Sequence, residues 1–97
     1  MNLSLEQTEA LRRFSRDAER AVASTHIEKR LDARQSLQQA KAAVPAREIA
    51  IVDLVMVRGR SLKALATASG QSVEQLDQLL RQAANSLADH YQTREAA

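Results

Sequence analysis

Apolar residues recur every three or four positions along most of this chain, and this spacing is typical of amphipathic α-helices. The first such stripe follows Ser4, which with Gln7 forms an S-x-x-Q capping box and marks a helix start. Its apolar positions are Leu11, Phe14, Ala18, Ala21 and Val22. The pattern predicts an amphipathic helix that runs to about Ala23.

A second stripe begins near Thr25, which with Glu28 forms a T-x-x-E box. It lies on another helical face and contains Ile27, Leu31, Leu37, Ala40 and Val44. The change of face favours a break near Ser24–Thr25 over one continuous rod. Most other positions are charged or amide residues, so the apolar face is narrow. We expect this helix to lie on the surface or to pair with a partner helix.

Val44 and Pro45 separate this helix from the next segment. Proline is disfavoured inside a helix but suits the first turn of a new one. The segment that follows is apolar on nearly all sides between Ile49 and Val57, and its β-branched residues would also suit a strand. We favour a helix, because no second strand lies nearby in the sequence to pair with it. It is expected to end at Gly59 and to pack between the N-terminal helices and those that follow.

Residues 61–91 have the pattern of two helices joined by a tight turn. Ser61 stands where an N-cap is expected, and Gly70 follows the first helix, where glycine adopts a left-handed backbone at least cost. Ser72 and Gln75 form a second S-x-x-Q box that starts the longer helix. The apolar stripe of that helix comprises Val73, Leu76, Leu79, Leu80, Ala83, Ala84, Leu87, Ala88 and Tyr91. A short helix, a glycine turn and a longer helix are the outline of a helix-turn-helix.

Four side chains fit this motif. Ala66 is small where the first helix must approach the second, Gly70 makes the turn, and Leu76 and Leu79 are apolar where the crevice between the helices must be filled. The segment resembles the helix-turn-helix of sigma-factor region 4 and related bacterial regulators. Residues 45–92 are also similar to the C-terminal domain of alphaproteobacterial regulators, including activators of phage-like gene transfer agents.

The expected fold class is therefore all-α. We expect a trihelical helix-turn-helix domain over residues 45–92, an N-terminal helical extension over 1–44 and a frayed tail over 93–97. The resemblance implies a transcriptional regulator that binds double-stranded DNA, with RNA polymerase or another transcription protein as a candidate partner. The extension would form a homodimer or contact such a partner.

Composition agrees with a helical fold and narrows the functional classes. Phe14 and Tyr91 are the only aromatic residues among 97, so the core must be aliphatic and thin, and dimerisation would help to stabilise it. The chain has no cysteine, which excludes disulfides and thiolate metal sites. No signal peptide or membrane-spanning run is visible, and we expect a cytoplasmic protein that does not contact a membrane.

The chain is mildly basic, with 14 Lys and Arg residues against 12 Asp and Glu residues. Residues 1–44 hold eight basic and six acidic residues, and residues 45–97 hold six of each. The half expected to read DNA is therefore neutral. This balance weakens the case for nucleic acid unless positive charge is clustered locally.

One local cluster flanks the turn into the first helix of the motif. Arg58, Arg60 and Lys63 lie within six residues, next to the free amides of a helix N-terminus, and could hold DNA phosphates. The alternative is a solvated turn in which Arg58 caps the preceding helix. The sequence favours neither interpretation over the other.

The second helix has a polar stripe opposite its core face, formed by Glu74, Asp77, Gln78, Arg81 and Asn85. Gln78 could pair with adenine and Arg81 with guanine through two hydrogen bonds each, and a carboxylate can accept from cytosine N4. Against DNA, the carboxylates of Glu74 and Asp77 would repel phosphates. The residues expected to bind DNA are Arg58, Arg60, Lys63, Ser72, Glu74, Gln78 and Arg81.

Nothing in the sequence points to catalysis. His26 and His90 lack the spacing of a metal site such as H-E-x-x-H, and each is expected to be a solvated helix residue. There is no glycine-rich phosphate loop and no G-x-S-x-G elbow. We expect neither an enzyme nor a bound cofactor or metal.

Two functions fit these features. The first is a DNA-binding transcriptional regulator that docks the second helix of the motif in the major groove. The alternative is a non-enzymatic helical protein–protein interaction module with a helix-turn-helix fold. The mixed-sign stripe from Glu74 to Asn85 is the feature on which the two differ.

Overall fold

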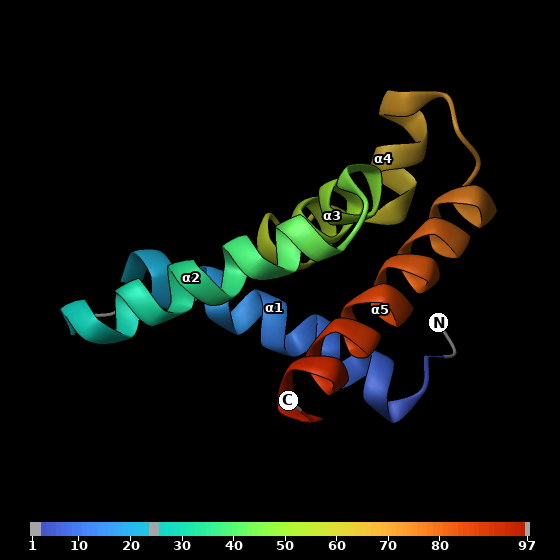
Figure 1. Cartoon of the computed structure of the whole chain (residues 1–97). Coiled ribbons are helices and arrows are strands. Elements are labelled where there is room, and N and C mark those ends of the chain that lie inside the picture. Colours follow the sequence, from blue (N-terminus) through green and yellow to red (C-terminus); the bar gives the residue numbers. More distant parts are fainter. Residues whose placement is uncertain (1–2, 24–25, 97) are drawn as a thin grey trace.

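The computed structural model describes residues 3–23 and 26–96. Its elements are α1 (Leu5–Ala23), α2 (Ile27–Ala43), α3 (Ala46–Val52), the π-helical turn η1 (Asp53–Val57), α4 (Leu62–Ser69) and α5 (Val73–Ala96) (Figure 1). No strand occurs in these residues, which confirms the all-α fold class. The segment after Pro45 is helical, as expected, and does not form a strand.

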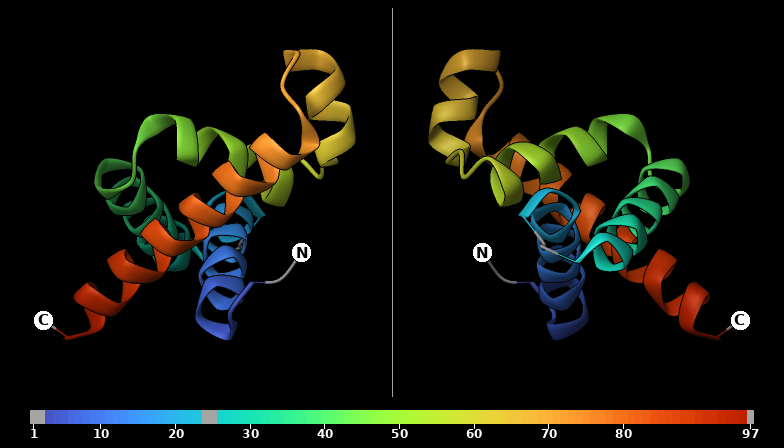
Figure 2. Two further views of the ribbon diagram at one scale, coloured as in Figure 1. Left: turned by 90° about the vertical axis from the view of Figure 1, so that its right-hand side faces the viewer. Right: turned by 90° about the vertical axis from the view of Figure 1, so that its left-hand side faces the viewer.

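The helices form two packed groups that share α5. α1 and α2 run antiparallel and pack along each other, and α5 crosses this pair (Figure 2). α3 packs on α5, and η1 packs on α1. The segment from Pro45 to Val57 therefore lies between α1 and α5, as the sequence predicted. α4 projects at one end of the molecule and packs on α5 (Figure 1).

One hydrophobic core joins these helices. Its largest fully buried side chains are Phe14 from α1, Val52 from α3, and Leu80 and Leu87 from α5. Leu11 and Ala21 are also buried, so three of the five apolar positions predicted for α1 are confirmed. The core cluster contains residues from both sides of Pro45, and α1 contributes to it as much as α3 does.

The predicted apolar stripes are wrong where α1 meets α2. Val22 is 79% exposed, Ile27 64% and Leu31 58%. The predicted positions Ala40 and Val44 are buried, and α2 also packs through Ala33 and Ser36, two small buried residues outside the predicted stripe. Small side chains let two helix axes approach closely, and this gain in packing outweighs the burial of two larger residues on another face.

Two of the three predicted capping boxes are formed in the structure, at the starts of α1 and α5. At the start of α1, the backbone N–H of Ser4 donates to Gln7 Oε1 at 3.0 Å, and the N–H of Gln7 donates to Ser4 Oγ at 3.1 Å. The break between α1 and α2 is also confirmed, since α2 begins at Ile27. His26 is the N-cap of α2 but provides no side-chain cap, and Thr25 lies outside the described residues.

The π-helical turn was not predicted. Within it the N–H of Arg58 donates to the Asp53 carbonyl oxygen at 3.0 Å, across five residues instead of the usual four. The carbonyl of Met56, near the end of the turn, accepts a hydrogen bond from Ser15 Oγ at 3.1 Å. Gly59 then takes a positive φ of 68°, and the helix ends there as expected.

The predicted fraying of residues 93–97 stays a prediction, but α5 is longer than expected. α5 does not stop near Tyr91 but continues as helix to Ala96. Neither glycine nor proline follows Tyr91, and the residues after it are mostly good helix formers. Each added residue therefore gains a backbone hydrogen bond to the turn before it, and nothing in the sequence interrupts the helix.

Candidate functional site

The connection from α4 to α5 is built from local signals that the sequence predicted. Ser61 Oγ accepts a hydrogen bond from the N–H of Ala64 at 3.1 Å and caps α4. Gly70 ends α4 with a φ of 76°, and its N–H donates to the Ala66 carbonyl oxygen at 3.0 Å. Ser72 and Gln75 then exchange the two hydrogen bonds of a capping box, at 3.0 and 3.1 Å. The turn between α4 and α5 is thus closed by hydrogen bonds between groups three or four residues apart.

α4 is held to the core by a small apolar contact. Leu62, Leu65 and Ala66 are each half-buried and pack against the core cluster, and no residue of α4 is fully buried. On α5, Leu76 is buried and Leu79 is half-buried. Ala66 is thus only half-buried where a buried residue was expected, and α4 leaves most of its surface to solvent.

Of the three cations predicted to hold phosphates, Arg58 and Arg60 lie on the connection from η1 to α4 and Lys63 lies in the first turn of α4. All three are exposed. Arg58 Nε lies 3.1 Å from Asp53 Oδ2, within the turn that it ends. An ion pair so open to solvent contributes little to stability, and Arg58 can exchange it for another anion at small cost. Arg60 and Lys63 extend the same surface toward α4.

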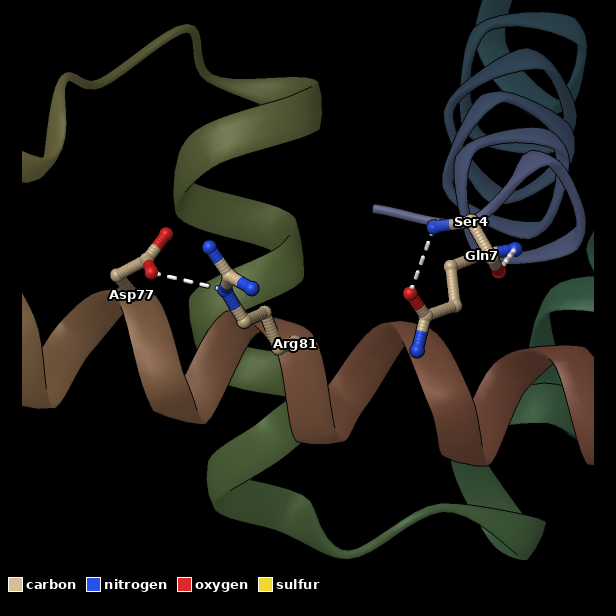
Figure 3. A network of polar contacts seen from close by, with 4 residues as sticks. All are labelled: Ser4, Gln7, Asp77 and Arg81. Carbon is tan, nitrogen blue, oxygen red and sulfur yellow. Dashed lines mark hydrogen bonds and ion pairs between the residues drawn. The ribbon is translucent and has the colours of Figure 1, made fainter. Parts of the chain in front are cut away.

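The predicted base-reading residues on α5 differ in exposure and in whether their side chains are already hydrogen-bonded. Glu74 and Gln78 are exposed, whereas the Ser72 hydroxyl is engaged in the cap of α5. Arg81 is half-buried, and its Nε donates to Asp77 Oδ2 at 2.9 Å, so its side chain bends back along the helix (Figure 3). The Asp-to-Arg spacing of four residues was visible in the sequence and is the signal for this pair. Gln78 is therefore the predicted reader with the most freedom to reach an external partner.

The two histidines have different surroundings. His26 is exposed, as expected. His90 is half-buried, and its ring centroid lies 5.2 Å from that of Tyr91 with the planes tilted by 54°. The expectation of a solvated side chain is therefore wrong for His90. No group of three or more His, Asp and Glu side chains that could hold a metal ion is found among residues 3–23 and 26–96.

A second surface was not predicted. A hollow of about 700 Å³ opens between α1 and the C-terminal part of α5. Ala10, Ala88 and Tyr91 line its base, and the guanidinium carbon of Arg13 lies 4.3 Å from the centre of the Tyr91 ring. Its charged lining comprises Glu6, Glu9, Arg12, Arg13, Arg16, Asp17 and Arg20. These residues all lie on one helix, and only the crossing of α1 by α5 makes them part of a concave surface.

Two exposed polar surfaces thus stand out, one on α4 and the start of α5 and one between α1 and the end of α5. No helix in the described part of the chain combines the length and the apolar character needed to cross a membrane. No family model matches the chain, and no curated protein and no solved structure is significantly similar to it.

Proposed function

We propose that the protein is a DNA-binding transcriptional regulator and that α4, the Gly70 turn and α5 act as a helix-turn-helix. The observation that supports this proposal most strongly is the local geometry of that unit. Two capped helices meet at a left-handed glycine, and the longer one has an exposed polar face at its start. The resemblance of residues 45–92 to bacterial regulators points to the same function.

In this proposal the first turns of α5 enter the major groove, which is wide enough for a helix. Gln78 contacts a base edge there, because its amide is exposed and can donate to and accept from adenine together. Arg58, Arg60 and Lys63 contact phosphates on the flanking backbone and fix the position of the helix. Because the C-terminal half of the chain is neutral, affinity for random DNA should be modest.

The alternative is a protein-docking surface, and one contact favours it. Arg81 is paired with Asp77 at 2.9 Å, and Glu74 adds a second carboxylate to the same helix. A surface of mixed sign suits a polar protein interface better than a phosphate backbone. The resemblance implies RNA polymerase or another transcription protein as the partner of this surface.

A salt-dependent titration of the intact chain on duplex DNA tests the proposal. Fluorescence anisotropy with a labelled random duplex is measured from low to moderate salt, for the unmodified chain, Lys63→Ala and Lys29→Ala. Both lysines are exposed, but Lys29 lies in α2, whose start is at the opposite end of the molecule from α4 (Figure 1). Lys63→Ala should weaken binding to every duplex and reduce the salt slope by about one charge, whereas Lys29→Ala should change neither.

A matched pair of variants tests the base-reading role separately. On a site selected from a randomised library, Gln78→Ala should lose roughly 1–3 kcal/mol of binding free energy while random DNA is bound almost as before. Gln82→Ala, also exposed on α5 but one turn further along, should leave both unchanged. A chain that is folded by circular dichroism but binds no duplex at low salt would refute the regulator and leave the protein-docking alternative.

A further inference from the structure

The hollow between α1 and α5 has an ordered arrangement of charge. Glu6, Glu9, Arg13, Arg16 and Arg20 all line it. They are separated by three or four residues in turn, so they form a single stripe along α1. The acidic residues occupy the first part of the stripe and the basic residues the last part. The stripe therefore has a negative end and a positive end, with Arg13 at its middle.

This order has a symmetry that a second α1 can satisfy. Glu6 and Arg20 lie equally far from Arg13 along the chain, and Glu9 and Arg16 lie nearly equally far from it on either side. When two identical helices are antiparallel about a two-fold axis, residues at equal distances from the axis meet, and the same flank of each helix faces its copy. With the axis near Arg13, Glu9 meets Arg16 of the second copy and Glu6 meets Arg20.

We propose that the protein forms a homodimer in which the α1 stripes of two copies pair antiparallel in these hollows. Four ion pairs of opposite charge then span the axis. A parallel pair would instead bring acidic ends together and basic ends together, which is repulsive. An acidic peptide is a poorer occupant than a second copy, because Glu6 and Glu9 would repel it at one end of the hollow.

Three charges in the hollow do not pair across the axis. Arg13 and Asp17 are engaged within the chain, whereas Arg12 is exposed and lies near the axis. Arg13 would lie close to its own copy at the axis, but its guanidinium stacks on the Tyr91 ring and is held toward α5. Asp17 accepts a hydrogen bond from Ser36 Oγ at 2.8 Å and is held toward α2. The residues that must pair across the axis differ from these two, since Glu6, Glu9, Arg16 and Arg20 are all exposed.

Exposed ion pairs each contribute little, so the dimer should be weak and sensitive to salt, with the charges fixing its register more than its affinity. The proposal stands apart from DNA binding, since it uses another surface. Sedimentation velocity of the intact chain over a range of concentrations, at low and at high salt, measures it directly. The unmodified chain should show a monomer–dimer equilibrium that high salt shifts toward monomer.

Charge reversal then tests the register. Glu9→Arg and Arg16→Glu should each raise the dimer dissociation constant at least tenfold, and the double variant should restore it, because the pair is then rebuilt with its signs exchanged. An equimolar mixture of the two single variants should form a heterodimer, which native mass spectrometry can detect by mass. Glu28→Arg and Arg34→Glu make the same charge changes at exposed positions of α2 and should have no effect.

Three outcomes would overturn the proposal. The first is a chain that stays monomeric at low salt at every concentration. The second is a dimer whose dissociation constant neither single reversal changes. The third is a double variant that fails to recover, which would rule out the antiparallel register even if the chain dimerises.

Discussion

Three serine side chains provide specific polar contacts between helices around a mainly aliphatic core. Ser15 donates to the Met56 carbonyl, Ser36 to Asp17, and Ser86 to Glu48 Oε1 at 2.7 Å. A hydroxyl on a short side chain can bond across a helix contact without holding the helices apart. The Glu48 contact is the most consequential, because that carboxylate is only 9% exposed and a buried charge without a partner is costly.

Loss of the Ser86 hydroxyl should therefore destabilise the fold. We expect Ser86→Ala to lower the free energy of unfolding by about 1–3 kcal/mol, because a buried carboxylate loses a hydrogen-bond donor. Asn85→Ala changes an exposed residue next to it and should stay within about 0.5 kcal/mol. Urea unfolding monitored by circular dichroism gives both values. Equal stabilities for the two variants would mean that the Glu48 contact contributes nothing.

Signals carried by neighbouring residues predicted the elements well. The caps at Ser4, Ser61 and Ser72 and the left-handed Gly70 depend on groups within three or four residues, so the sequence determines them directly. The all-α class and the turn inside the candidate site were predictable for that reason. Which face of α2 is buried was not, because that choice depends on how closely α1 can approach.

The other features that the sequence did not predict also depend on contacts between distant segments. The π-helical turn, the burial of Glu48 and the hollow between α1 and α5 all arise where segments distant in sequence meet. For the candidate site, the exposure of Gln78 followed from the helical period, and the exposure of Arg58 and Arg60 from their position in a turn. The hydrogen bond from Arg81 to Asp77 is local and could have been predicted, but opposite charges at this spacing also fit two solvated side chains.

The correction on α1 and α2 yields a test at the level of whole helices. Phe14 is fully buried in α1, whereas Leu31 is 58% exposed on α2. Phe14→Ala should cost about 3–5 kcal/mol of unfolding free energy through lost burial and a cavity. Leu31→Ala should cost less than about 0.5 kcal/mol, as expected for a surface position. Thermal and urea melts would contradict this packing if the Leu31 variant were as unstable as the Phe14 variant.

At the scale of the molecule, one hydrophobic core spans the predicted division at residue 44. The core cluster contains Leu11 and Phe14 from one side of it and Leu80 and Leu87 from the other. α1 covers α5 and η1, so both would lose apolar cover without it. The segment that follows residue 44 is therefore expected to need the N-terminal helices for its own stability.

Truncation tests this dependence. A chain that starts at Val44 should expose the α5 core face and become poorly soluble or lose its cooperative thermal transition. A chain shortened only by residues 1–2 keeps Leu3 and the Ser4 cap and serves as the control, and it should melt nearly as the full chain does. Size-exclusion chromatography and circular dichroism measure both. A soluble, monomeric fragment with a sharp melt would show that residues 45–97 fold alone.

The packing of α1 against α5 also affects how the protein is made. These helices are the first and the last of the described residues, and their mutual contacts are distant in sequence. During translation α1 leaves the ribosome first but cannot bury Phe14 against α5 until that helix has also emerged. Until then the nascent chain presents the apolar face of α1 to water and to chaperones. A ribosome that stalls before α5 would therefore release a product that quality control can recognise as unfinished.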